Sequence, residues 1–246
     1  MAREAALAYL CQPAEADFAR ILRINSPRSV EGLADLLALH ASAARPDAVL
    51  IPKCQSADEI RIVADILNGT QAKAGIIPMV ELARALFAVD AMAQAHERVC
   101  GLFLGGGDMA GDLGADGAWE SLLLARSQIV AAAATAGIAA IDSPYFKGDS
   151  AGLEREAAAS RKLGMTGKAA LHAEQLAVIS TIFTPAPDVV SHARSVLAAA
   201  AGGGVAVLAG HVIEPAMIRE AERVLAIATR QHDHAPGLTQ RVPSCT

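Results

Sequence analysis

The chain has 246 residues, 53% of them hydrophobic and 19% charged, which favours one large globular domain. Its net charge of −5 at pH 7 argues against a basic surface for nucleic acid, and no segment reaches the roughly 18 uninterrupted apolar residues of a membrane span. The four cysteines form no C-x-x-C pair, which argues against a disulfide framework and a zinc site. We therefore expect a cytoplasmic protein without nucleic-acid or membrane partners.

Short apolar segments recur along the chain, and each is followed by an alanine- and leucine-rich segment with helical periodicity. Continuously apolar segments are typical of parallel strands that are covered on both faces. Their alternation with helices predicts a parallel α/β sheet. The predicted strands, in chain order, are Ile21–Asn25, Asp47–Lys53, Gly75–Glu81, Cys100–Asp108, Gly137–Asp142 and the region Gly167–His172.

Ionisable residues stand at the carboxyl end of one predicted strand after another. In a (β/α)₈ barrel this end of the strands forms the face that carries the active site. The alternative is that these charges only solvate the strand ends. The residues concerned are Arg23, Lys53, Glu81, Asp108, Asp142, and His172 after Lys168.

The segment LFLGGGDMAGDLG places Gly105, Gly107 and Ala110 in the spacing of a dinucleotide-binding turn, G-x-G-x-x-A. That turn is expected after the first strand, with an acidic residue about 20 positions later, and neither condition holds here. A nucleotide-dependent oxidoreductase is thus a distant alternative. We interpret Asp108 as the functional residue and the glycines as a loop that offers N–H groups to an anion.

Seven segments, in order, resemble the HpcH/HpaI type of aldolases, which includes the citrate lyase β-subunit and malyl-CoA lyase. RIN at Arg23–Asn25 looks like the R-V-N strand end of that family, and GGGDMAGDLG is similar to its G-x-x-D-L-A-x-D-L-G segment. The other segments are VLIPKCQSADEI, PMVELARAL, IDSPYFKGDSAGL, GMTGKAALHAEQ and the helix starting near IEPAMIREAERVL.

The resemblance implies a TIM barrel and a Mg²⁺-dependent carbon–carbon lyase, with Mn²⁺ as a possible substitute. Its substrate would be a short β-hydroxy acyl-CoA, such as malyl-, citramalyl- or citryl-CoA, or a related 2-keto acid aldol. Carried over by position, Glu81 and Asp108 would bind the metal, and Glu81 would act in catalysis. Arg23 would hold the carboxylate of the keto acid and stabilise an enolate oxygen. Alternatively, Glu81 is a helix N-terminal acid and Arg23 a structural ion-pair partner.

Two further residues are candidates for binding the substrate or cofactor. Gly107 would offer its backbone to the ligand. Lys53 would either position the substrate or form an ion pair across the mouth of the barrel.

The catalytic aspartate of the family's G-K-M-I-D segment aligns with Glu214 in GHVIEP. In relatives this acid reaches into a neighbouring subunit's site and protonates the enolate carbon, so a homo-oligomer, by resemblance a trimer, is expected. The extra methylene of glutamate moves the carboxyl by about 1.5 Å. Alternatively, Glu214 is an acid at the start of a helix. In GKAALHAEQ, Ala173 stands where proline is usual.

The family's first two strands are not recognisable in the sequence, so we expect an N-terminally incomplete (β/α)₈ barrel of about six strands, with Ile21–Asn25 at a free edge. The expected organisation is this barrel over residues 1–200, a strand and helix extension over 201–230 and a disordered tail over 231–246. The absent strands and Glu214 leave a second hypothesis: a non-catalytic acyl-CoA- or keto-acid-binding paralogue, or an assembly subunit.

Overall fold

The computed structural model describes residues 2–13, 18–68, 73–202, 207–208 and 210–232. The chain divides into two compact units, and the boundary between Ile179 and Ser180 falls within helix α9 (Ala173–Phe183). This boundary precedes residue 200, where the sequence analysis placed the end of the barrel. Helix α11 (Pro215–His232) extends into the predicted tail, and residues 233–246 lie outside the described part of the chain.

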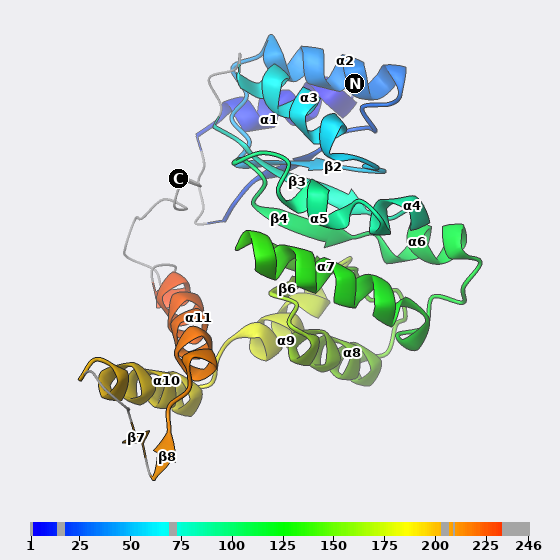
Figure 1. Cartoon of the computed structure of the whole chain (residues 1–246). Coiled ribbons are helices and arrows are strands. Elements are labelled where there is room, and N and C mark those ends of the chain that lie inside the picture. Colours follow the sequence, from blue (N-terminus) through cyan, green and yellow to red (C-terminus); the bar gives the residue numbers. More distant parts are fainter. Residues whose placement is uncertain (1, 14–17, 69–72, 203–206, 209, 233–246) are drawn as a thin grey trace. The chain divides into compact units, whose positions relative to one another are not determined.

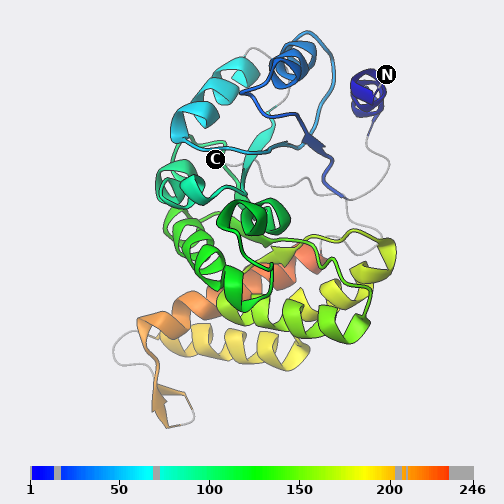
Figure 2. The same ribbon diagram turned by 90° about the vertical axis from the view of Figure 1, so that its right-hand side faces the viewer.

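The first unit contains a sheet of six parallel strands in which each strand pairs with the next one along the chain (Figures 1 and 2). Leu22 lies opposite Val49, and Val49 lies opposite Ile76. This order is that of successive β–α–β units, as the sequence predicts. The strands are β1 (Ile21–Arg23), β2 (Ala48–Ile51), β3 (Gly75–Val80), β4 (Gly101–Leu104), β5 (Ala139–Asp142) and β6 (Gly167–Lys168).

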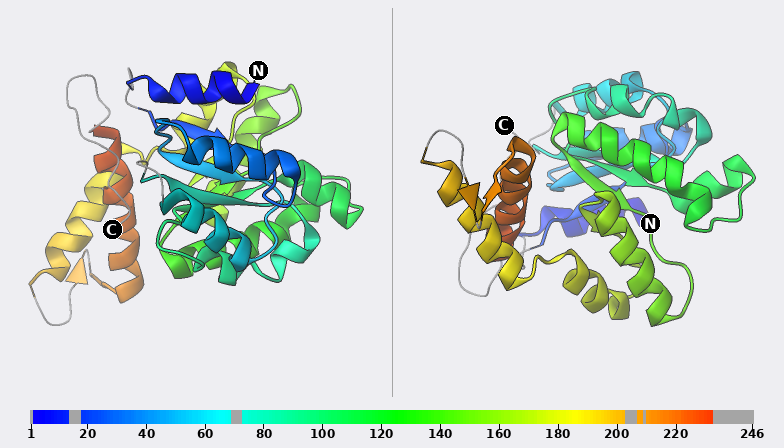
Figure 3. Two further views of the ribbon diagram at one scale, coloured as in Figure 1. Left: turned by 90° about the horizontal axis from the view of Figure 1, so that it is seen from above. Right: turned by 60° about the horizontal axis from the view of Figure 1, so that its bottom comes forward.

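Helices connect the strands and pack against one another in sequence (Figure 3). Contacts run from α2 to α3, from α3 to α5, from α5 to α7 and from α7 to α8, while α7 also packs on β4 and β5. The helices of this unit before α9 are α1 (Ala2–Cys11), α2 (Val30–His40), α3 (Ala57–Asn68), α4 (Ala83–Leu86), α5 (Val89–Ala93), α6 (Gly106–Leu113), the 3₁₀ turn η1 (Glu120–Leu122), α7 (Leu123–Ala136) and α8 (Ser150–Leu163).

Strand β3, in the middle of the sheet, is buried on both faces. Ile76 and Val80 on one face expose none of their surface, and Ile77 and Met79 on the other face expose 6% and 5%. Each fully buried side chain of this size contributes about 1.5–3 kcal/mol of transfer free energy. The continuous apolar runs seen in the sequence thus form the core that fixes the strand ends.

The sheet remains open, and this agrees with the incomplete barrel that the sequence analysis predicts. Strands β1 and β6 are its two edges, and within the described residues no strand pairs with the outer side of β1. Strand β1 ends at Arg23, earlier than predicted, because the backbone N–H and side-chain amide of Asn25 both donate to Asp35 Oδ2 at 2.8 Å. The six-stranded, incomplete architecture is confirmed.

Strands β4 and β6 fall furthest short of the ends that the sequence analysis gave them. Strand β4 stops at Leu104, and α6 begins at Gly106, so Asp108 lies in the first turn of a helix. The predicted strand over Cys100–Asp108 was therefore too long, because the glycines turn the chain into α6. Likewise β6 stops at Lys168, and the exposed His172 lies beyond it.

The second unit is built around helices α10 (Pro187–Ala200) and α11, whose contacts enclose a small apolar core. Ala193, Val196, Ile213 and Ala221 are the buried members of this core. Strands β7 (Val207–Leu208) and β8 (His211–Val212) form an antiparallel hairpin in this unit. No helix among the described residues is long and apolar enough to cross a membrane.

A cluster of charged side chains lies buried at the end of β5. Asp142 accepts hydrogen bonds from Arg126 Nε and Lys168 Nζ, each at 2.9 Å, and from the Ser160 hydroxyl. Lys168 also contacts Glu156 at 2.7 Å. Burial alone would raise the pKa of Asp142, but the charges of Lys168 and Arg126 outweigh it and lower the pKa. Asp142 is therefore a structural ion-pair partner that joins α7, β5 and β6.

The substitution Asp142→Ala should lower the free energy of unfolding by about 3–5 kcal/mol, because it leaves two buried cations without their shared partner. The matched control is Asp58→Ala, which breaks the exposed pair with Arg61 and should cost less than about 1 kcal/mol. Urea denaturation followed by circular dichroism measures both. Equal losses for the two variants would contradict a structural role for the buried cluster.

Candidate active site

Glu81 directly follows strand β3, and only 1% of its surface is exposed. Its Oε1 accepts a hydrogen bond of 2.6 Å from the backbone N–H of Lys53, which lies just beyond the end of β2. Burial raises the pKa of Glu81, and the hydrogen bond from Lys53 opposes this effect. A buried carboxyl group whose pKa is shifted from its ordinary value is a candidate functional group.

Asp108 is the immediate electrostatic neighbour of Glu81. The carboxyl of Asp108 further raises the pKa of Glu81, while the positive charge of Arg23 at the end of β1 lowers it. Lys53 Nζ lies 3.8 Å from Asp108 Oδ1, with both side chains about half exposed. The structure thus brings Arg23, Lys53, Glu81 and Asp108 together at the carboxyl ends of β1 to β4.

Two carboxylates held side by side, one of them buried, form a site in which a cation relieves their mutual repulsion. Their hard oxygen atoms suit Mg²⁺, which often takes one or two carboxylates and completes its shell with water and substrate. Within the described residues no cluster of three or more His, Cys, Asp or Glu side chains forms a metal site. The donor set of Glu81 and Asp108 therefore fits Mg²⁺ and does not provide the nitrogen and sulfur ligands typical of Zn²⁺.

Two supporting residues were missed by the sequence analysis. Asp112 Oδ2 accepts a hydrogen bond of 2.6 Å from the backbone N–H of Ala83, and so caps helix α4, whose N-cap Leu82 makes no side-chain hydrogen bond. Asp112 stands four residues after Asp108, and this spacing on one helix face was the available signal. Gly105 lies against the side chain of Glu81. No sequence signal distinguished it from the neighbouring glycines.

Gly107, the other predicted ligand-binding residue, is exposed near the start of α6. Together with Gly106 it lines a cleft of about 720 Å³, a volume typical of small-molecule sites. Aromatic side chains also line this cleft, among them Trp119, Tyr145 and Phe146. Of the predicted site residues, Gly107 lines this cleft, whereas Arg23, Lys53, Glu81 and Asp108 do not.

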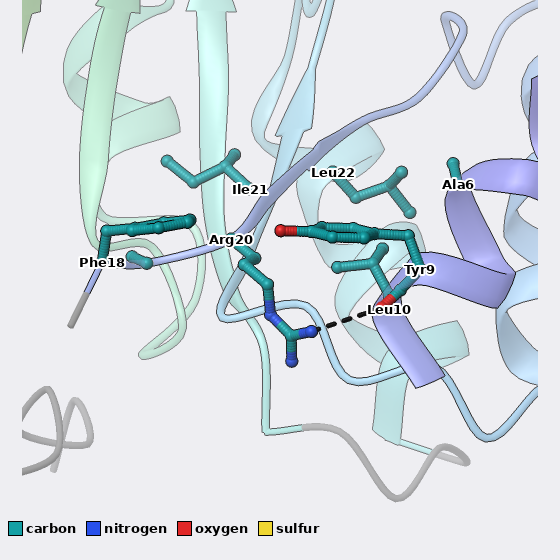
Figure 4. A pocket seen from close by; sticks show the side chains of 8 residues that line it. Ala6, Tyr9, Leu10, Phe18, Arg20, Ile21 and Leu22 are labelled. Atoms are coloured by element: carbon teal, nitrogen blue, oxygen red, sulfur yellow. Dashed lines mark hydrogen bonds between the residues drawn. The ribbon is translucent and has the colours of Figure 1, made fainter. Parts of the chain in front are cut away.

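A second, smaller pocket of about 290 Å³ lies between α1 and β1 (Figure 4). Tyr9, Phe18 and Ile21 line it, and Arg20 Nη1 reaches across to the carbonyl oxygen of Tyr9 at 3.4 Å. None of the predicted site residues lines this pocket. It belongs to the edge of the sheet rather than to the group of carboxylates.

Two ionisable residues that the sequence analysis singled out do not belong to the first-unit residues around Glu81. They are Asp142 and Glu214. Asp142 is taken up by the buried ion pairs with Arg126 and Lys168, so its strand-end position does not serve a ligand. Glu214 is exposed and belongs to the second unit, where its carbonyl oxygen accepts hydrogen bonds from the backbone of the first turn of α11.

Comparison with known proteins gives consistent matches. Residues 1–173 match the family described as HpcH/HpaI aldolase/citrate lyase. The chain is 32% identical over 232 residues to human mitochondrial citramalyl-CoA lyase, covering 85% of this chain and 68% of that protein. It is also 32% identical to citrate lyase subunit beta of Escherichia coli, covering 89% and 77% of the two chains.

Among solved structures, protein CitE from Mycobacterium tuberculosis, in complex with magnesium, acetoacetate and coenzyme A, superimposes with a TM-score of 0.67 at 27% identity. The match covers 85% of this chain and 78% of that one. The family match spans all six strands of the sheet and includes Glu81 together with Arg23, Lys53 and Asp108. The chain belongs to the HpcH/HpaI aldolase/citrate lyase family.

Proposed function

We propose that this protein is a Mg²⁺-dependent carbon–carbon lyase that cleaves or forms a short β-hydroxy acyl-CoA. Malyl-, citramalyl- and citryl-CoA are the substrate types, and a related 2-keto acid aldol is the alternative within the same chemistry. The observation that carries the proposal is the buried Glu81 carboxylate beside Asp108, with Arg23 close enough to act on its pKa. The names and bound ligands of the relatives support it.

Glu81 and Asp108 are the proposed ligands of the metal. When bound, Mg²⁺ would polarise the carbonyl group at the carbon–carbon bond that is cleaved or formed. Glu81 enters this role already oriented by the hydrogen bond from Lys53. Asp108, half exposed in the first turn of α6, remains accessible to water and substrate oxygens.

Arg23, Lys53 and Gly107 are the proposed substrate contacts. The guanidinium of Arg23, exposed at the end of β1, provides bidentate recognition of the keto acid carboxylate and stabilises the enolate oxygen. The ammonium of Lys53 and the backbone N–H of Gly107 add positive potential for the anionic substrate. The bond between the α and β carbons then breaks, and the proton of the β-hydroxyl group passes to solvent, which releases the keto acid and leaves the enolate of the acyl-CoA.

Glu214 is the proposed acid that protonates the enolate carbon. It follows a short hairpin in the second unit, at the start of α11, and its carboxyl is exposed. We further propose, by resemblance, that it acts in a neighbouring subunit of a homo-oligomer, a trimer, located in the cytoplasm. The three described cysteines are free thiols, which agrees with a reducing compartment.

A second candidate function is binding without turnover. The open sheet, and glutamate at the position of the family's catalytic aspartate, favour a paralogue that retains the scaffold. A misplacement of about 1 Å can cost on the order of 100-fold in rate. Isothermal titration with acyl-CoA and keto acid, combined with a turnover assay, separates the two functions.

The variants Glu81→Ala and Asp108→Ala should each lower kcat/KM by at least about 100-fold, because each removes a proposed ligand of the metal that polarises the substrate. The assay combines the protein, Mg²⁺, acetyl- or propionyl-CoA and glyoxylate, and detects the condensed product by mass spectrometry. Simple aldol substrates without CoA are tested in parallel.

The control for this assay is Asp58→Ala, an acid on the exposed face of α3, which should retain wild-type activity. Absence of turnover by folded wild-type protein across the whole panel would contradict the proposed lyase. Unchanged turnover in either carboxylate variant would contradict its role as a metal ligand.

The variant Glu81→Gln should raise the melting temperature of the metal-free protein by about 2–4 °C at pH 8 while abolishing turnover. The pKa of Glu81 is raised above its ordinary value of 4.5, chiefly by burial. The folded state therefore favours the protonated form of Glu81 more than the unfolded chain does. The ionised carboxylate therefore destabilises the fold as the pH rises through the raised pKa, and glutamine removes that penalty.

Differential scanning fluorimetry in the presence of a chelator measures this effect between pH 4 and pH 8. The difference between the variant and the wild type should shrink towards pH 4, where Glu81 is protonated in both folded and unfolded states. A variant that is less stable than the wild type at pH 8 would show that the charge of Glu81 stabilises the fold.

A further inference from the structure

Lys53 has an unusual backbone conformation. It is the one non-glycine residue in the described part of the chain with a positive φ, of 53°. Residues with a Cβ atom avoid this left-handed region, and they persist there only where the surrounding structure enforces it. The strained residue lies at the end of β2, directly beside the proposed metal ligands.

The conformation of Lys53 reconciles two requirements of the chain. The N–H of Lys53 is aimed at Glu81 Oε1, 2.6 Å away. Immediately afterwards the chain must turn so that Cys54 is buried and α3 can begin at Ala57. A change in φ rotates the chain that follows the N–H group and leaves the N–H group itself in place. A positive φ at Lys53 therefore permits this turn while the amide stays directed at the Glu81 carboxylate.

Gly105 bounds the opposite side of the same carboxylate. A Cβ atom at Gly105 would lie 2.4 Å from Glu81 Cβ and 2.5 Å from Glu81 Oε2, distances that real Cβ atoms do not adopt. The N–H of Gly105 donates to the carbonyl oxygen of Val80 at 3.1 Å, which holds this backbone against the end of β3. Any side chain at Gly105 would therefore displace Glu81.

We propose that Lys53 and Gly105 are positioning residues that fix the Glu81 carboxylate for a divalent cation. Lys53 acts on Glu81 through its left-handed backbone, and not through its ammonium group, which faces Asp108 at 3.8 Å. Gly105 acts through the absence of a side chain. This inference rests on the proposed function, because it concerns the affinity of the same site for the metal.

The test compares residues at position 53 that tolerate or avoid the left-handed region. Lys53→Gly and Lys53→Asn remove the ammonium but accept a positive φ, whereas Lys53→Val resists it. Binding of Mn²⁺ alone to the full chain is measured by electron paramagnetic resonance. The dissociation constant should stay within about threefold of wild type for glycine and asparagine and rise by about 10–100-fold for valine, the effect typical of lost support around a metal ligand.

The second arm of the experiment addresses the other flank. Gly105→Ala should also raise the Mn²⁺ dissociation constant by about 10–100-fold. Its matched control is Gly111→Ala in helix α6, where a Cβ atom would meet nothing within 4 Å, and this variant should bind Mn²⁺ as the wild type does. Circular dichroism and thermal melting establish that each variant is folded.

Equal loss of Mn²⁺ binding in the glycine, asparagine and valine variants would assign the effect to the ammonium group and overturn the inference. Unchanged binding in Gly105→Ala would overturn the role of Gly105. If Lys53→Val does not fold, Lys53→Ala replaces it, with a smaller loss expected in the same direction. A folded wild-type protein that binds no Mn²⁺ overturns the proposed metal site itself, which distinguishes the two failures.

Discussion

The short hydrogen bond between the Lys53 amide and Glu81 holds a buried carboxylate in place next to a second one. Burial and the neighbouring Asp108 both disfavour the charge on Glu81. Three neighbouring residues accommodate this carboxylate. Lys53 takes a left-handed backbone conformation, Gly105 leaves room for the side chain, and Asp112 caps the helix that follows Glu81. Local features that cost stability are typical of sites that must bind a ligand.

The buried cluster around Asp142 has a different role, although it also contains charges at strand ends. Its acid is matched by two cations at hydrogen-bonding distance, so the group is electrostatically satisfied within the protein. At Glu81 the neighbouring cations, Arg23 and Lys53, have exposed side chains, and the group that acts on its charge from α6 is another acid, Asp108. This contrast is the physical reason why we propose ligand binding at Glu81 and a structural role for Asp142.

The sequence was sufficient to predict the six parallel strands, the unclosed sheet and the meeting of Glu81 with Asp108. The strands and the meeting of the two acids follow from continuous apolar runs and from the rule that parallel strands end on one side of a sheet. The unclosed sheet was expected from the family resemblance, because the first two strands of the family are not recognisable in this sequence. The end of β4 was misplaced, because the glycines after Leu104 fit either an extended or a helical continuation. The pairing of Asp142 with Arg126 could not be predicted either, because nothing in the alanine-rich helix α7 marks Arg126 as buried. The close approach of Gly105 to Glu81 could not be predicted, because it depends on how the ends of β3 and β4 lie against each other in three dimensions.

The claim that organises the site is that Glu81 and Asp108 share one divalent cation. Crystals grown with Mn²⁺, measured at a wavelength where manganese scatters anomalously, test it directly. We expect a single peak within about 2.0–2.3 Å of an oxygen atom of each carboxylate. A peak bound to other residues, or two carboxylates that turn away from each other around an empty site in crystals soaked with Mn²⁺, would contradict the account.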